Sequence, residues 1–195
     1  MRRVCVFCGS SPGADPRFGE AAQALGSLLA RSGIGVVFGG GRVGLMGILA
    51  DAALGHGGQV IGVIPQALAR REIAHQGLTE LRLVDSMHTR KALMADLSDG
   101  FIALPGGLGT LDELCEILTW AQLGLHGKPT GILNVSGYFD LFLAFLDRAV
   151  SERLVRPEHR SALLVDSEPA ALLSRMAGWQ PVTVDKLLPA PEVER

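Results

Sequence analysis

Short apolar segments alternate with longer segments of helical periodicity along most of the chain. The apolar segments are Arg3–Cys8, Gly35–Phe38, Val60–Ile64, Phe101–Leu104, Gly131–Val135 and Ala162–Val165. Apolar residues recur with helical spacing over Phe18–Ala30, Val43–Leu54, Met87–Leu97, Thr110–Leu123, Phe139–Val150 and Pro169–Met176. This alternation predicts right-handed βαβ units. Because the apolar segments are apolar throughout, it indicates an α/β fold with a parallel sheet and helices on both faces.

The length of 195 residues favours a single domain. We predict that this domain covers residues 1–178 and that residues 179–195, which carry three prolines and a charged end, form a C-terminal tail. The longest interruption, Pro65–Ser86, is polar and contains Glu72. Long connections in compact domains are often functional, so we expect a functional loop there.

Charge and cysteine content limit the partners and the compartment. The formal net charge is -2, which leaves no basic excess for binding a nucleic acid. No apolar run approaches the roughly 18 residues of a membrane span. The three cysteines cannot form an even disulfide framework, and the pair Cys5 and Cys8 lies in a predicted strand with the thiols facing opposite sides. The N-terminus has no signal-peptide pattern. We therefore expect a reduced, cytoplasmic protein without nucleic-acid or membrane partners.

Glycines concentrate where predicted strands run into helices. Of the 25 glycines, eleven lie between residues 33 and 62 and four between residues 100 and 109. Backbone N–H groups at such turns, together with the helix dipole, bind phosphate. Such turns follow three predicted strands, at Gly9, at Gly39–Gly44 and at Gly106–Gly109. Together they predict a nucleotide site, unless their glycines only close tight βα turns. The candidate phosphate-binding residues are Gly9, Ser10, Gly40, Gly41 and Gly106.

Other nucleotide and metal motifs are not supported. Gly39, Gly41 and Gly44 match G-x-G-x-x-G, but the motif follows the second strand, and no acidic residue ends the next strand, as NAD binding requires. The chain has no G-K-[ST] sequence, which excludes an ATP-hydrolysing P-loop. Its five histidines lack metal-ligand spacing, so we expect no metal site.

Four residues have the chemistry for a reaction at these turns. Thr110 and Glu113 have the spacing of a helix capping box, and Glu113 would also lie beside an anion held by the turn before it. Arg90 and Lys91 lie on the preceding predicted helix. They could form a solvated face, or they could flank the same crevice and bind phosphate or ribose oxygens.

These motifs together resemble one known family. The sequence PGGLGTLDE at Pro105–Glu113, the upstream Met87, His88, Arg90 and Lys91, and GGGRVGLMG at Gly39–Gly47 are similar to those of the LOG (Lonely Guy) family. Its members are cytokinin riboside 5'-monophosphate phosphoribohydrolases, formerly called lysine decarboxylases. The resemblance extends over roughly Val4–Val165, and its P-G-G-x-G-T-x-x-E signature with an upstream R-K is specific.

The resemblance implies a Rossmann-like homodimer that hydrolyses the N-glycosidic bond of an adenosine 5'-monophosphate, including N6-modified forms. The products are the free base and ribose 5-phosphate, and no metal or organic cofactor is implied. Arg90 and Glu113 match the catalytic pair of the family. The substrate-contacting positions correspond to Glu72, Arg90, Lys91, Gly107, Leu108, Gly109, Thr110, Leu111, Asp112, Glu113 and Thr119.

Two other functions remain open from the residues alone. The chain could be a nucleotide sensor of the same fold that binds its ligand without cleaving it. A decarboxylase using pyridoxal phosphate would need a Schiff-base lysine, and the chain has only Lys91, Lys128 and Lys186. The apolar residues of the Thr110–Leu125 segment favour a dimer, because they exceed what one contact with a sheet requires; they are Leu114, Ile117, Leu118, Trp120 and Ala121.

Overall fold

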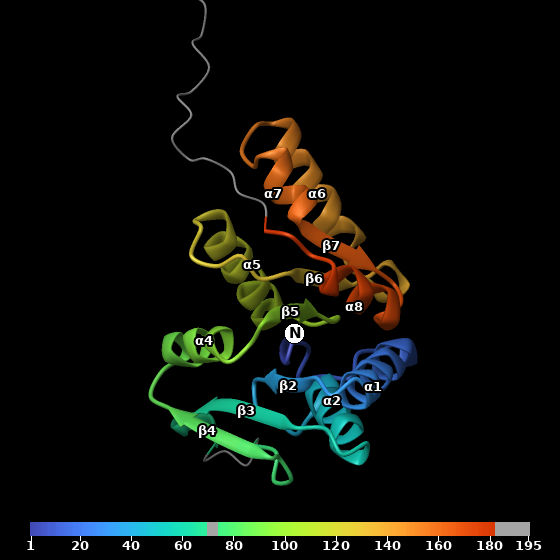
Figure 1. Ribbon diagram of the computed structural model, residues 1–195, viewed down its shortest axis with the longest axis vertical. Coiled ribbons are helices and arrows are strands. Elements are labelled where there is room, and N and C mark those ends of the chain that lie inside the picture. Colours follow the sequence, from blue (N-terminus) through green and yellow to red (C-terminus); the bar gives the residue numbers. More distant parts are fainter. Residues whose placement is uncertain (70–73, 182–195) are drawn as a thin grey trace, which may run out of the picture.

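A computed structural model describes residues 1–69 and 74–181 of the chain (Figure 1). The strands are β1 (Arg3–Phe7), β2 (Gly35–Phe38), β3 (Val60–Pro65), β4 (Glu80–Val84), β5 (Gly100–Ala103), β6 (Thr130–Leu133) and β7 (Leu163–Asp166). The helices are α1 (Pro16–Arg31), α2 (Gly44–Gly55), α3 (Gln66–Leu68), α4 (Met87–Asp96), α5 (Leu108–Gln122), α6 (Asp140–Ser151), α7 (Pro157–Ala162) and α8 (Pro169–Ala177), with a 3-10 turn, η2 (Val135–Gly137), before α6.

One sheet of seven strands organises the domain, in the order β4-β3-β2-β1-β5-β6-β7. Every neighbouring pair is parallel. The chain builds outward from β1 to β4 and then crosses to β5 on the other side of β1. Because the loops after β1 and β5 diverge, the carboxyl ends of these two strands form the crevice where open α/β sheets bind ligands. The predicted single-domain α/β fold is confirmed.

Helices cover both faces of the sheet. In Figure 1, α1, α2 and α8 lie on one side, and α4 and α5 lie on the other. The residues of β1 alternate between two apolar clusters, with Val4 and Val6 facing the first group of helices and Cys5 and Phe7 facing the second. Cys8 faces the first group, so the prediction of two buried thiols on opposite sides is confirmed. Burial raises the pKa of both thiols, which keeps them protonated.

The sequence pattern does not predict β4 or α7. β4 lies within Pro65–Ser86, the segment interpreted as a polar loop, and pairs with β3 at the edge of the sheet. Its three central residues, Leu81, Arg82 and Leu83, are exposed. An edge strand needs no continuous apolar run, so its mixed sequence gives a weak signal. α7 has only six residues, none of them buried, and shows no amphipathic period.

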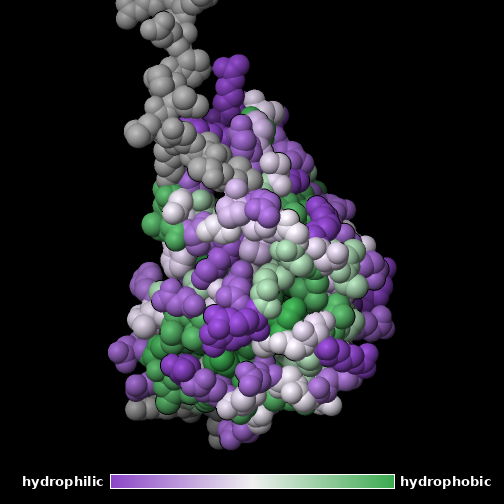
Figure 2. Space-filling model, viewed as in Figure 1, coloured by the Kyte–Doolittle hydropathy of each residue, from purple (hydrophilic) through white to green (hydrophobic). Residues whose placement is uncertain are grey.

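The face shown in Figure 2 carries small apolar and hydrophilic patches side by side. The apolar area at its lower left lies in the region of β3, β4 and α4, where Leu81, Leu83 and Met87 are exposed. No helix in the described part of the chain is long and apolar enough to cross a membrane.

The start of the predicted C-terminal tail belongs with the domain. Trp179 packs against the cluster formed by α1, α2 and α8, and its Nε1 donates to the carbonyl of Gly127 at 3.2 Å. The rest of the predicted tail, from residue 182, lies outside the described residues.

Candidate active site

Helix α4 presents the two basic residues singled out in the sequence. Ser86 caps the helix, because its hydroxyl accepts from the Thr89 N–H at 3.1 Å. One turn later, Arg90 Nη1 contacts Glu113 Oε1 of α5 at 2.8 Å. The Nε of Arg90 donates to the carbonyl of Val63 at the end of β3, at 3.0 Å. Only 12% of the Arg90 side chain and 9% of the Glu113 side chain are exposed, so the pair is held in a partly desolvated setting.

The environment of Glu113 favours its protonated form more than water does. Burial raises the pKa of this carboxyl and is the largest effect, while the positive charge of Arg90 works in the opposite direction. The net pKa lies above the usual value. A carboxylate with a raised pKa is a stronger base, which suits proton transfer near neutral pH.

The predicted capping box is wrong. The N-cap of α5 is Gly107, and no side chain in the described part of the chain caps this helix end. Thr110 is the third helical residue and is buried against Gly106, where a Cβ would overlap the Thr110 hydroxyl. Glu113 lies one turn further on and pairs with Arg90. The T-x-x-E spacing therefore reflects the packing of Thr110 and the contact of Glu113 with α4, because the helix begins three residues earlier than the capping box requires.

The loop between β5 and α5 opens onto a cavity at the carboxyl ends of β1 and β5. The Gly9 N–H donates to the carbonyl of Pro105 at 3.1 Å, which joins the two loops. A cavity of about 270 Å³ lies between them, lined by Gly9, Ser10, Ser11, Pro12, Gly13, Phe18, Leu45, Pro105, Gly106, Gly107 and Tyr138. A Cβ at Gly107 or at Gly109 would meet nothing within 4 Å. The first N–H groups of α5 lack intrahelical partners, and in the described part of the structure the space beside Gly107 and Gly109 is free of other protein atoms, so an anion can approach this helix start.

Three of the five candidate phosphate-binding residues, Gly9, Ser10 and Gly106, surround this cavity. The other two lie in the β2–α2 turn and contact protein. The carbonyl of Gly40 accepts from the His75 N–H at 2.9 Å, and Gly41 forms an isolated bridge with Ala74. The preceding Gly39 makes room for Arg90, because a Cβ there would overlap the Arg90 Nη2.

The remaining predicted substrate contacts are dispersed. Lys91 Nζ pairs with Asp112 at 3.0 Å and with Glu116 at 3.2 Å, so it ties α4 to α5. These carboxylates raise the pKa of Lys91 although burial opposes them. Leu108 is 86% exposed at the start of α5, and Leu111 packs on the α5–α6 cluster. Glu72 lies outside the described residues.

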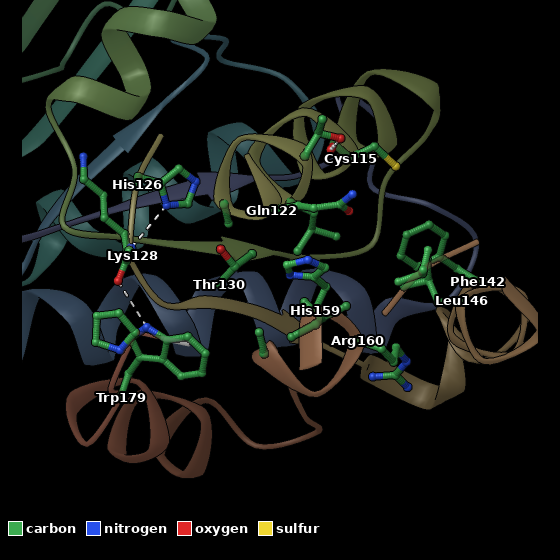
Figure 3. A pocket seen from close by; sticks show the side chains of 18 residues that line it. Cys115, Gln122, His126, Lys128, Thr130, Phe142, Leu146, His159, Arg160 and Trp179 are labelled. Carbon is green, nitrogen blue, oxygen red and sulfur yellow. Dashed lines mark hydrogen bonds between the residues drawn. The ribbon is translucent and has the colours of Figure 1, made fainter. Parts of the chain in front are cut away.

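Thr119 lies beside a second cavity, away from the Arg90–Glu113 pair. This cavity, of about 200 Å³, separates the end of α5 from α6 and α7 (Figure 3). Its lining combines apolar side chains, among them Phe142, Leu146 and Trp179, with polar ones such as Gln122 and His126. Thr119 is exposed and donates to the carbonyl of Cys115 at 2.7 Å. Neither cavity is lined by Arg90 or Glu113. We place the candidate active site at the β1–β5 crevice because Gly106 and Gly107, directly before α5, line its cavity, whereas the second cavity holds only the later part of α5.

The apolar residues that favoured a dimer are partly used within the protomer. Leu114 and Ile117 are buried against the sheet, in the clusters that α5 shares with α6 and with α4. These two residues therefore contribute no surface to a dimer contact. The exposed apolar residues at the end of α5 are Leu123 and Leu125.

Two partners of the site are absent from the sequence-based predictions. The Val63 carbonyl holds Arg90, and the Tyr138 hydroxyl donates to the Gly106 carbonyl at 2.6 Å. Tyr138 follows β6, the strand next to β5, so its position after a strand end was an available signal. Within the described residues, no group of three or more His, Cys, Asp or Glu side chains could hold a metal ion.

Comparisons with known proteins show the family to which the chain belongs. A family model described as "Possible lysine decarboxylase" matches residues 46–176. The probable cytokinin riboside 5'-monophosphate phosphoribohydrolase LOGL5 of Oryza sativa subsp. japonica is 52% identical over 181 residues, which cover 93% of this chain and 74% of the relative. The cytokinin riboside 5'-monophosphate phosphoribohydrolase LOG7 of Arabidopsis thaliana is 47% identical over 181 residues, covering 93% and 83% respectively.

Solved structures with lower identity share the fold. The molybdenum cofactor binding protein from Rippkaea orientalis superimposes with a TM-score of 0.69 at 22% identity, covering 91% of this chain and 96% of that protein. The Moco carrier protein from Chlamydomonas reinhardtii gives a TM-score of 0.68 at 19% identity, covering 91% and 98%.

Proposed function

The chain belongs to the LOG family of cytokinin riboside 5'-monophosphate phosphoribohydrolases, and on that premise we propose that it hydrolyses the N-glycosidic bond of adenosine 5'-monophosphates, N6-modified forms included. The products are the free base and ribose 5-phosphate. The observation that carries this proposal is the buried Arg90–Glu113 pair within two helical turns of an open helix start that no side chain of the described residues caps.

The start of α5 binds the 5'-phosphate. Its free N–H groups and the positive end of the helix dipole favour an anion, and the open space at Gly107 and Gly109 lets phosphate oxygens approach the backbone. Glu113 lies five residues, about 7.5 Å, beyond the first residue of the helix. A nucleotide anchored by its phosphate at the helix start therefore presents its ribose to the carboxylate.

Glu113 acts on the sugar. Cleavage of an N-glycosidic bond develops positive charge on the ribose, as in the oxocarbenium-like transition states of sugar hydrolysis. The carboxylate stabilises this charge and accepts a proton from the attacking water. The water oxygen bonds to C1', and the electron pair of the broken bond stays with the base, which takes up a proton. Arg90 orients Glu113 and contacts the ribose phosphate.

Pyridoxal phosphate chemistry needs a lysine available to form a Schiff base, and both lysines in the described part of the structure are engaged by other groups. Lys91 is held by two carboxylates, and the Nζ of Lys128 donates to the Ala95 carbonyl at 2.9 Å. Lys186 lies outside the described residues. The hydrolase and the sensor differ only in whether the bound nucleotide is cleaved.

Incubation with AMP and with isopentenyl-AMP, followed by chromatography of the released base, tests the proposal. Glu113→Gln should lower base release at least about a hundredfold, because it removes the carboxylate base and its charge. Glu116→Gln, one turn further along α5 and paired with Lys91, is the matched control and should retain activity. Near-normal release by Glu113→Gln would overturn the assignment, and wild-type protein that binds AMP without releasing base would be a sensor.

We further propose a homodimer in which Thr119 contacts the substrate of the partner subunit. Nine residues along α5 place Thr119 about 13 Å from Thr110, on an exposed face, so it is too far along the helix to reach a phosphate bound at the α5 start of its own protomer. Light scattering gives the oligomeric state. A monomer at the concentration used for the activity assay would contradict the shared site.

The cellular setting is also part of the proposal. A net charge of -2 supports a small-molecule substrate and argues against nucleic acid as a partner. The free cysteines support a reducing cytoplasm, away from membranes. Fractionation of cells that produce the protein tests the location.

A further inference from the structure

The turn between β6 and α6 has a shape that its own side chains specify. Asn134 Oδ1 accepts from the Phe139 N–H at 2.8 Å, and Asn134 Nδ2 donates to Asp140 Oδ1 at 2.7 Å. Ser136 and Gly137 adopt positive φ values of 54° and 72°. A non-glycine residue in this region needs support from its surroundings. The hydrogen bonds of Asn134 therefore hold this turn in one conformation, and that conformation directs Tyr138 toward the neighbouring β5–α5 loop.

Tyr138 connects the β6–α6 turn to the cavity. Its hydroxyl donates to the Gly106 carbonyl at 2.6 Å. Its ring packs edge-on against Phe18 of α1, with centroids 5.3 Å apart, and against Phe139 at 5.1 Å. The side chain is 45% exposed and lines the cavity together with Gly9, Ser10 and Gly107. A ligand in the cavity would lie beside it.

The peptide that Tyr138 holds joins two glycines, Gly106 and Gly107. Such a peptide has little intrinsic preference for one orientation, because neither residue has a Cβ. In a planar trans peptide the C=O and the following N–H point in opposite directions. A hydroxyl that fixes the Gly106 carbonyl therefore also fixes the Gly107 N–H. If the peptide flipped, a carbonyl oxygen would face the anion in place of an N–H donor.

We propose that Tyr138 is a positioning residue for the phosphate-binding loop: its hydroxyl holds the Gly106–Gly107 peptide in the orientation that directs the Gly107 N–H to the 5'-phosphate. The identity of the anion rests on the proposed function. The hydrogen bond acts on ground-state binding, since the phosphate keeps its charge throughout the reaction.

Tyr138→Phe removes the hydroxyl and keeps the ring contacts. We expect the KM for AMP, and the dissociation constant for ribose 5-phosphate measured by calorimetry, to rise about three- to tenfold, as for the loss of one hydrogen bond. The kcat should change less than twofold. Ser151→Ala is the matched control, because Ser151 also donates a hydroxyl to a backbone carbonyl, that of Arg148 at 2.7 Å, at the far end of α6. Its affinity and KM should match the wild type.

A single tyrosine in the chain gives a direct readout of the loop. Protein labelled with 3-fluorotyrosine should show one fluorine resonance, and this resonance should shift when AMP or ribose 5-phosphate is added. Tyr138→Phe with an unchanged KM for AMP and an unchanged affinity for ribose 5-phosphate, whether or not its thermal stability falls, would overturn the proposal. A fall in kcat as large as the rise in KM would also overturn it, because Tyr138 would then act in the chemical step.

The same measurements separate this inference from the proposed function. If wild-type protein releases no base from AMP, the hydrolase assignment fails. The calorimetric affinities and the fluorine shift with ribose 5-phosphate do not depend on turnover, so they still decide the role of Tyr138.

Discussion

The β2–α2 and β5–α5 turns look alike in sequence and serve different purposes in the fold. Both are glycine runs that follow a parallel strand and open a helix. In the β2–α2 turn, the missing side chains admit other parts of the protein: Gly39 accommodates the Arg90 guanidinium, and Gly44 lies against the Ser10–Ser11 peptide. In the β5–α5 turn, Gly107 and Gly109 border open space.

The difference shows what a glycine run in a sequence indicates. It indicates that something approaches the backbone closely, but the approaching group can be a ligand or the protein itself. At the β2–α2 turn the approaching group is the positive half of the candidate catalytic pair. The β2–α2 turn, which is filled by other parts of the protein, thus positions Arg90. The β5–α5 turn, which is open at Gly107 and Gly109, offers N–H groups to the substrate.

Gly44→Ala should have the largest effect and tests the filled turn. Gly44 has a φ of 61°, and a Cβ there would overlap the backbone between Ser10 and Ser11. We expect the free energy of unfolding to fall by about 3 kcal/mol or more, from backbone strain and the clash combined. Denaturant unfolding measures this. Gly55→Ala, in the same helix with nothing within 4 Å of its Cβ position, is the control and should be neutral or stabilising.

Gly39→Ala should separate positioning from folding. The new methyl group would displace the end of a flexible arginine side chain, so the fold should survive while the Arg90–Glu113 contact is lost. We expect kcat/KM for AMP to fall about a hundredfold, the usual effect of misplacing a reacting group by about 1 Å. Steady-state kinetics together with a thermal melt give both values. Full activity would show that Gly39 is not needed to seat Arg90.

The pH dependence tests the pair that joins the two turns. Because burial raises the pKa of Glu113, the acidic limb of kcat/KM should have its midpoint above the ordinary glutamate value of 4.5. The folded state also binds this proton more tightly than the unfolded chain, so the contribution of Glu113 to stability is largest below pH 4.5 and declines as pH rises through the folded pKa. Glu113→Gln should therefore gain stability relative to the wild type as pH rises. A midpoint at or below 4.5 would contradict the desolvated setting.

Gly109→Ala should have the smallest effect and tests the open turn. Gly109 is the second residue of α5, and its Cβ position is free of contacts. We expect the free energy of unfolding to rise by about 0.5 to 1 kcal/mol, because alanine favours the helix. A loss of stability would show that this turn is packed as tightly as β2–α2, and the distinction between the two turns would not hold.

Most of the sheet was predictable because buried parallel strands carry an unbroken apolar signal. β1 to β3 and β5 to β7 follow the predicted segments within a few residues, whereas the edge strand β4 does not. Arg90 and Glu113 were identified from their chemistry and their place beside the predicted glycine turn, and the family motif matched them to the catalytic pair. Their 2.8 Å contact joins residues 23 positions apart, so its geometry depends on the packing of α4 against α5, which no local pattern specifies. The capping box at Thr110 was wrong because a T-x-x-E spacing does not specify where the helix begins.

The sequence by itself determined the layered α/β architecture and the family to which the chain belongs. It also determined that the glycine turns lie together at the carboxyl ends of the strands. These properties follow from periodicity and local motifs, which depend on neighbours along the chain. Only the tertiary structure decided which glycine turn is filled and which is open, that the Val63 carbonyl and Gly39 seat Arg90, and that Tyr138 holds Gly106. These contacts join segments distant in sequence, and they depend on the register and packing of the sheet and its helices, which no local pattern specifies.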